Sequence, residues 1–182
     1  MYQIIKQILR TGIKSETPPQ PDDALRLGAP QLQQKILQHI GRALAIRHVD
    51  AGSCNGCDLE IHALNNAYYN IEGLGIQFVA SPRHADMLLV TGPVSRHMAT
   101  ALRRTFDATP EPKLVVAVGD CGCTGGIFCA ANSAGDNGES YASCGKVSSV
   151  IPVDVAVPGC PPTPTAILQA ILTAVTGSTI NV

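Results

Sequence analysis

The chain has 182 residues, of which 45% are hydrophobic and 15% are charged, and its formal net charge is −1. This composition is typical of a compact α/β protein, and the lack of a basic stripe argues against a nucleic-acid-binding surface. No apolar run reaches the roughly 20 residues that cross a bilayer and no secretory signal pattern is present, so we expect the chain to stay in the cytosolic compartment.

The first 16 residues have the pattern of a short basic amphipathic helix. Apolar residues fall on one face and basic residues elsewhere: Ile4, Ile5, Ile8, Leu9 and Ile13 against Lys6, Arg10 and Lys14. Such a helix can lie on a membrane surface, in a groove of a partner or against its own domain. The Pro-rich stretch 15–23 (SETPPQPDD) then predicts a linker or extended arm. We therefore expect a helix and docking arm at 1–30 and a folded domain at 31–182.

From about residue 30 onward, strand-like and helix-like segments alternate, which predicts a parallel sheet covered by helices. Several predicted strands are nearly continuous apolar runs, as in parallel strands that are buried on both faces. The strands are predicted at 44–49, 75–80, 87–91, 114–118 and 153–157. The helices are predicted at 31–40, 59–69, 96–106 and 165–175.

Four of the seven cysteines follow directly on three of these strands. Cys54 and Cys57 follow the first strand, Cys121 the fourth and Cys160 the last. Because the carboxyl ends of parallel strands meet at one edge of a sheet, these four thiols can reach one centre. Disulfides are not expected in a reducing compartment, which makes metal binding the leading use of the cysteines.

The loops that carry the four cysteines are rich in glycine and proline: GSCNGC at 52–57, GDCG at 119–122 and PGCPP at 158–162. Glycine lets backbone N–H groups approach the sulfurs of a cluster, and such donors tune its reduction potential. A lone C-x-x-C also occurs in zinc sites and redox dithiols. Zinc usually takes two closely spaced ligand pairs, whereas Cys121 and Cys160 stand alone, so the spacing favours an iron-sulfur cluster and leaves zinc as the alternative.

The other three cysteines, Cys123, Cys129 and Cys144, fall short of the four ligands of a second cluster, and we interpret them as free or buried thiols. The histidines form no metal-ligand pair at helical spacing; they are His39, His48, His62, His84 and His97. His84, in a predicted loop, is the only histidine that we would place near the site, and a surface or packing role is favoured for it.

Four segments around these residues resemble the small subunit of membrane-bound nickel-iron hydrogenases of the formate-hydrogenlyase and energy-converting type. They are AGSCNGCDLEIHALNN (51–66), SPRHADMLLVTGPV (81–94), GDCGCTGGIF (119–128) and IPVDVAVPGCPPTP (151–164). The resemblance covers about residues 40–175 and extends to the cluster subunit of respiratory complex I. That subunit has adjacent cysteines as its first two ligands, whereas Asn55 and Gly56 separate Cys54 from Cys57, as in hydrogenases.

The resemblance implies a flavodoxin-like, doubly wound parallel sheet with one proximal 4Fe-4S cluster at the carboxyl edge of the strands. The implied ligands are Cys54, Cys57, Cys121 and Cys160. The implied partners are a nickel-iron large subunit, a ferredoxin-like subunit and membrane subunits, at the cytoplasmic side of the inner membrane. No residue of this chain is then catalytic, because the chain only transfers electrons. Cys123 and an expanded segment at 129–146 depart from the family pattern.

Three other functions stay open at this point. The chain can belong to a complex I-like quinone oxidoreductase, or to a hydrogenase-related complex without nickel. It can also be a stand-alone zinc or redox-dithiol domain. Metal content separates the last of these from the others.

Overall fold

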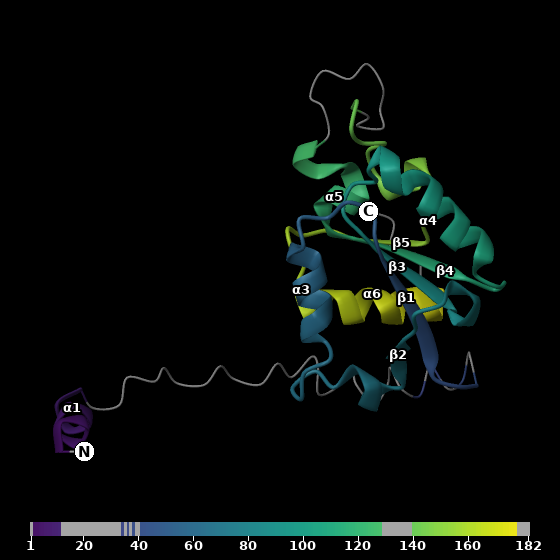
Figure 1. Cartoon of the computed structure of the whole chain (residues 1–182). Helices are drawn as coiled ribbons and strands as arrows, with labels where there is room; N and C mark the ends of the chain where they lie inside the picture. Colours follow the sequence, from purple (N-terminus) through teal and green to yellow (C-terminus); the bar gives the residue numbers. More distant parts are fainter. Residues whose placement is uncertain are drawn as a thin grey trace.

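The computed structural model describes residues 2–11, 34, 36, 38, 41–128 and 140–177. Its centre is a five-stranded sheet whose strands all pair in parallel, in the order β2-β1-β3-β4-β5 (Figure 1). The strands are β1 (Leu44–Asp50), β2 (Ile76–Phe78), β3 (Met87–Thr91), β4 (Leu114–Val118) and β5 (Val155–Val157). This strand order is that of a flavodoxin-like doubly wound sheet, which confirms the predicted fold class.

The central strands β3 and β4 have the predicted bounds, because their apolar runs are buried on both faces. Along β3, Met87 and Leu89 point into one hydrophobic core, and Leu88 and Val90 point into a second core on the other face. The strands β2 and β5 lie at the two edges of the sheet and have three residues each, shorter than predicted.

Helices cover both faces of the sheet (Figure 1). The helices of the folded domain are α3 (Gly56–Ala63), α4 (Arg96–Ala108), α5 (Gly119–Thr124) and α6 (Pro164–Thr176). Ile61 of α3 and Ile167 of α6 belong to the core on the Met87 side of the sheet. Leu102 of α4 belongs to the core on the Leu88 side. Short 3-10 helices complete the connections: Ile71–Leu74, Pro82–His84, Gly126–Phe128 and Val147–Ser149.

Two helix starts are fixed by side chains that the sequence provides at the first position before the helix. The Ser95 hydroxyl accepts the N–H of Met98 at the start of α4, and the Thr163 hydroxyl accepts the N–H of Ala166 at the start of α6. Such caps satisfy N–H groups that have no partner within the helix. The caps explain why α4 and α6 begin within one residue of their predicted starts.

The amino-terminal helix α1 (Tyr2–Thr11) confirms the predicted amphipathic helix over its described part. Its apolar side chains Tyr2, Ile4, Ile5, Ile8 and Leu9 are between 53% and 80% exposed. The predicted helix at 31–40 lies mostly outside the described residues. Ile36, which is described, is helical and fully buried in the core. Within the described ranges, every helix is too short or too polar to span a bilayer.

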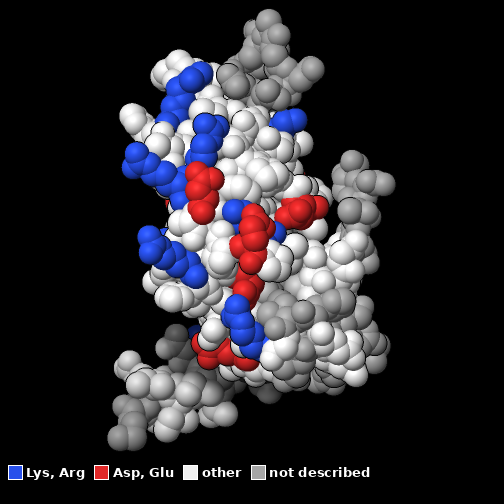
Figure 2. All heavy atoms as spheres, turned by 90° about the vertical axis from the view of Figure 1, so that its right-hand side faces the viewer, with Lys and Arg blue, Asp and Glu red and all other residues white. Residues whose placement is uncertain are grey.

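Figure 2 shows the face of the molecule that is on the right-hand side of Figure 1. Lys and Arg side chains lie along one side of this face, and Asp and Glu side chains interrupt them across its middle. Such a mixed surface on this face agrees with the absence of a basic stripe in the sequence.

Candidate metal centre

The four candidate cysteines meet around one pocket at the carboxyl edge of the sheet. The pocket has a volume of about 100 Å³, and Cys54, Cys57, Cys121 and Cys160 all line it. Cys54 and Cys160 are exposed, whereas Cys57 and Cys121 are half-buried. Loops that are up to about a hundred residues apart in sequence converge here because their strands are parallel.

Each cysteine is positioned by the chain that leaves a strand. Cys54 lies in the turn after β1, and Cys57 lies in the first turn of α3. Cys121 lies in α5 directly after β4, and Cys160 lies in the turn between β5 and α6. The sequence predicted a helix beginning after Cys57 and a loop around Cys121; both residues are instead in short helices.

Two glycines leave space for the inner sulfurs of the pocket, those of the half-buried Cys57 and Cys121. A Cβ atom on Gly119 would lie 2.6 Å from Sγ of Cys57, and a Cβ atom on Gly126 would lie 2.9 Å from Sγ of Cys121. Both glycines also have positive φ angles, which L side chains adopt at a cost. The close approach of these loops to the sulfurs therefore requires glycine at both positions.

The thiols influence one another's protonation, as expected for groups that surround one small pocket. The pKa of Cys57 is raised to about 11. Burial is the main cause, and Asp58 and the other three cysteines contribute. Burial and the neighbouring cysteines also raise the pKa of Cys121. Cys57 and Cys121 therefore hold their protons more tightly than free thiols do, and they suit a metal centre whose positive charge stabilises thiolates.

The donor set fits a cluster better than a single ion. In the described part of the chain, no three His, Cys, Asp or Glu side chains lie close enough together to hold one metal ion. The four cysteines instead surround a volume. In a 4Fe-4S cluster each protein sulfur binds a different iron, so the ligands stand farther apart than around one zinc ion.

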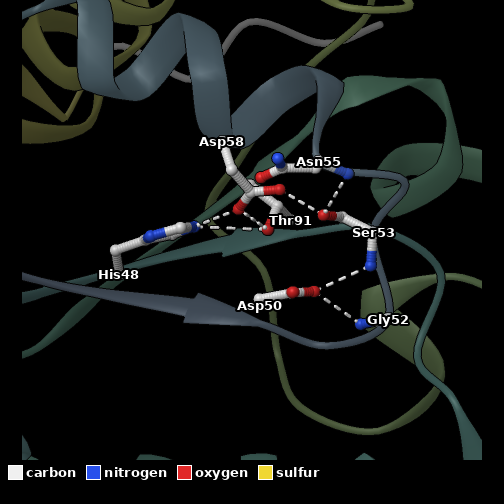
Figure 3. Close-up of polar contacts among 7 residues, drawn as sticks. All are labelled: His48, Asp50, Gly52, Ser53, Asn55, Asp58 and Thr91. Carbon is white, nitrogen blue, oxygen red and sulfur yellow. Dashed lines mark hydrogen bonds and ion pairs between the residues drawn. The ribbon is translucent and has the colours of Figure 1, made fainter.

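The turn that carries Cys54 is held by side chains at its base (Figure 3). One carboxylate oxygen of Asp50 accepts the N–H groups of Gly52 at 2.8 Å and Ser53 at 2.7 Å. The hydroxyl of Ser53 accepts the N–H of Asn55 at 3.1 Å, and Asn55 has a φ of 71°. Together these bonds fix the turn between β1 and α3.

A buried carboxylate lies directly after the second cysteine. Asp58 is 5% exposed and accepts hydrogen bonds from the hydroxyls of Ser53 and Thr91, the latter at 2.9 Å (Figure 3). His48 Nε2 lies 2.8 Å from the same carboxylate. Burial lowers the pKa of His48 more than Asp58 and Asp50 raise it, so the neutral ring donates from Nε2.

The sequence did not identify this network. Asp58 and Thr91 belong to two of the segments that resemble hydrogenase subunits, but their contact joins residues 33 positions apart. His48 has no motif around it. His48 also lines a second, open pocket of about 300 Å³ together with Arg47, His62 and Phe78. His84 is exposed and does not line the cysteine pocket, which agrees with the surface role favoured for it.

The other described cysteines do not line the cysteine pocket. Cys123 is half-buried, its thiol donates to the carbonyl of Ala117 at 3.7 Å, and burial raises its pKa to about 11. Cys144 is half-buried against the core on the Leu88 side of the sheet. Cys129 lies outside the described residues.

Comparison with known proteins finds similar chains among the subunits of hydrogenases and quinone oxidoreductases. Residues 54–174 match the family model described as the NADH ubiquinone oxidoreductase 20 kDa subunit. A probable membrane-bound hydrogenase subunit of Pyrococcus furiosus is 43% identical over 79% of this chain and 83% of that protein. Formate hydrogenlyase subunit 7 of Escherichia coli is 41% identical over 75% of this chain and 50% of that protein.

Subunits of respiratory complexes are also among the similar proteins. An NADH-quinone oxidoreductase subunit of Desulfovibrio desulfuricans is 43% identical over 72% of this chain and 66% of that protein. Among solved structures, a chain of an archaeal membrane-bound sulfane sulfur reductase is similar with a TM-score of 0.61 and 28% identity. That match covers 81% of this chain and 77% of the other.

Proposed function

Because the chain belongs to the family of the NADH ubiquinone oxidoreductase 20 kDa subunit, we propose that it is the electron-transfer subunit of a membrane-associated nickel-iron hydrogenase complex. In this proposal Cys54, Cys57, Cys121 and Cys160 hold one proximal 4Fe-4S cluster. The cluster lies between a ferredoxin-like subunit and the nickel-iron large subunit. This chain contributes no catalytic residue, because the chemistry of hydrogen takes place at the metal centre of the partner.

One observation carries the proposal: four thiols from three separate segments, each following a strand, surround one pocket at the carboxyl edge of a parallel sheet. The residues present fit the cluster, because the donors are all sulfur and two glycines make room for the inner sulfurs. When bound, a 4Fe-4S cluster supplies one-electron redox chemistry. The residues of this chain hold it, orient it and keep water from its inner side, where Cys57 packs against the hydrophobic core.

The outer side of the pocket supports a tight partner. Cys54 and Cys160 are exposed, and apolar side chains stand near the pocket without cover. Leu59, two residues after Cys57, is 61% exposed, and Ile127, next to Gly126, is 88% exposed. We infer that the large subunit covers this edge, with an interface of the obligate class that buries some 2,000–5,000 Å².

The spacing of the first two cysteines supports the hydrogenase branch of the family. Relatives named as hydrogenase subunits and as NADH-quinone oxidoreductase subunits match this chain at similar identity. Two residues separate Cys54 from Cys57, which resembles hydrogenases and differs from the adjacent cysteines of complex I. The similar structure from a sulfane sulfur reductase keeps a second candidate open, a hydrogenase-related complex without nickel.

The amino-terminal segment fits a role in assembly. We propose that residues 1–30 form a docking arm and residues 31–182 the cluster domain. The exposed apolar side chains of α1, with Lys6 and Arg10 on its other side, suit an anionic membrane surface or a groove in a neighbouring subunit. We also propose a peripheral position at the cytoplasmic side of the inner membrane.

Anaerobic purification of the complex from its native cells, through a tag on this chain, tests the function. We expect a nickel-containing large subunit and membrane subunits to co-purify, together with iron, acid-labile sulfide and an EPR signal that appears on reduction. Iron with no nickel would favour the second candidate. Zinc in place of iron, or a lone chain that keeps its cluster in air, would contradict the proposal.

A further inference from the structure

We propose that the buried carboxylate of Asp58 sets a low reduction potential for the cluster, by placing a fixed negative charge directly beside it. This inference rests on the proposed function, because it requires a cluster on the four cysteines. It assigns to Asp58 a role distinct from that of a ligand: the side chain acts through its charge and does not bind iron.

The contacts of Asp58 suit a carboxylate that keeps its charge (Figure 3). Its oxygens face three donors: the hydroxyls of Ser53 and Thr91 and Nε2 of His48. Within the described residues, no Lys or Arg forms an ion pair with it. Donors therefore stabilise the negative charge, while no permanent cation cancels it.

Three residues connect this carboxylate to the pocket. Cys57 precedes Asp58 in the chain, and Ser53 both lines the pocket and donates to Asp58. Thr91, the second hydroxyl donor, is followed by Gly92, which also lines the pocket. The charge thus lies directly behind residues that line the pocket, where its 5% exposure gives water little access to screen it.

Simple electrostatics then gives the direction of the effect. Reduction adds one electron to the cluster, with no bond made or broken, so the reduced site is more negative than the oxidised site. A buried negative charge nearby raises the energy of the reduced state more than that of the oxidised state. The carboxylate therefore lowers the reduction potential, which suits a carrier that works with strongly reducing partners.

The same turn offers a matched control in Asp50. This carboxylate is exposed and accepts the N–H groups of Gly52 and Ser53 through one oxygen. Asn can keep both bonds through its amide oxygen, so Asp50→Asn removes a charge of the same turn without removing its hydrogen bonds. Because water screens an exposed charge, this change should affect the potential much less.

Asp58→Asn is the corresponding change at the buried site. The hydroxyls of Ser53 and Thr91 and the neutral ring of His48 can each accept as well as donate, so an amide can be satisfied among them. Asp58→Glu keeps the charge and serves as the conservative variant. All three variants are to be purified in the native complex, anaerobically, beside the unchanged protein.

The measurement is an EPR-monitored redox titration with dithionite as reductant, together with iron and sulfide content. We expect Asp58→Asn to shift the midpoint potential of this cluster to a more positive value, and Asp58→Glu and Asp50→Asn to stay near the unchanged protein. Full iron in Asp58→Asn with an unshifted midpoint would overturn the role of the charge. An unchanged protein without iron would overturn the proposed function itself, and this inference with it.

If Asp58→Asn fails to hold iron, the same titration is made on Thr91→Val and Ser53→Ala instead. Each keeps the carboxylate and removes one donor that offsets its charge, so each should shift the midpoint potential to a more negative value. A midpoint that stays in place in both variants, with full iron content, would overturn the inference.

Discussion

A Cβ atom on Gly119 would lie 2.6 Å from the sulfur of Cys57, so the chain leaving β4 touches the sulfur carried by α3. This contact joins two of the three loops that form the pocket. It also makes Gly119 a residue on which the site depends although it donates no side chain.

Gly119→Ala should therefore prevent the cluster from being held. The new methyl group displaces the Cys57 sulfur, and the φ of 85° adds strain of about 1–2 kcal/mol. Gly75→Ala is the matched control, because Gly75 has a φ of 81° with nothing within 4 Å of its Cβ position. Both variants should lose stability, but only Gly119→Ala should lose iron, measured per chain in the purified complex. Equal iron in the two variants would show that the contact is unimportant.

Cys123 should behave as an unreactive thiol although it is only half-buried. Burial raises its pKa to about 11 from the ordinary 9.0, so the folded state holds the proton more tightly than the unfolded state. The stability that this protonation contributes is present below about pH 9 and is lost as the pH rises towards about 11. Alkylation by iodoacetamide, followed by peptide mass spectrometry, should increase with pH through about 11 in the folded protein and through about 9 in urea. Fast labelling of folded protein at neutral pH would contradict this assignment.

His48 should make the subunit less stable in acid. Burial lowers its pKa below the ordinary 6.5, outweighing the opposite effects of Asp58 and Asp50, while His62 also lowers it. The unfolded chain then binds a proton before the folded chain does, so the free energy of unfolding is highest above 6.5 and falls as the pH decreases.

His48→Gln isolates this effect, since an amide can still donate to Asp58 but does not titrate. Thermal unfolding of the complex at about pH 7.5 and about pH 5.5 should show a smaller loss of melting temperature in the variant than in the unchanged protein. Identical losses in the two proteins would mean that His48 is not the group responsible.

The apolar face of α1 should hold the chain in its complex. Ile8→Glu places a charge on that face, and losing the burial of one Ile side chain is worth about 1.5–3 kcal/mol, a weakening of roughly tenfold or more. Gln3→Glu adds the same charge on the opposite face as a control. We expect Ile8→Glu to leave the membrane fraction with its iron intact and Gln3→Glu to stay. If both variants sediment with the membranes, α1 has no docking role.

The strands show how far local pattern predicts this fold. Met87–Thr91 and Leu114–Val118 were predicted to the residue, because a central strand buried on both faces is a continuous apolar run with polar residues at its ends. The helix α5 was missed because its six residues include glycine and aspartate, which favour turns over helices. Tertiary contacts fold this segment around Cys121.

The site was predicted only in part, for a similar reason. Strand ends are local features, so the meeting of Cys54, Cys57, Cys121 and Cys160 at one edge followed from the order of elements. The network of Asp58 depends on a contact with Thr91 across 33 residues, which no local pattern reports.

Replacing cysteines one at a time tests the central claim most directly. Each of Cys54→Ser, Cys57→Ser, Cys121→Ser and Cys160→Ser should abolish or convert the cluster, since each sulfur binds a separate iron. Cys144→Ser is the control and should keep about four iron atoms per chain, as a 4Fe-4S cluster requires. The measurement is iron content with the EPR spectrum of the reduced complex, purified anaerobically. Full iron and an unchanged spectrum in Cys160→Ser would contradict the assignment of the four ligands.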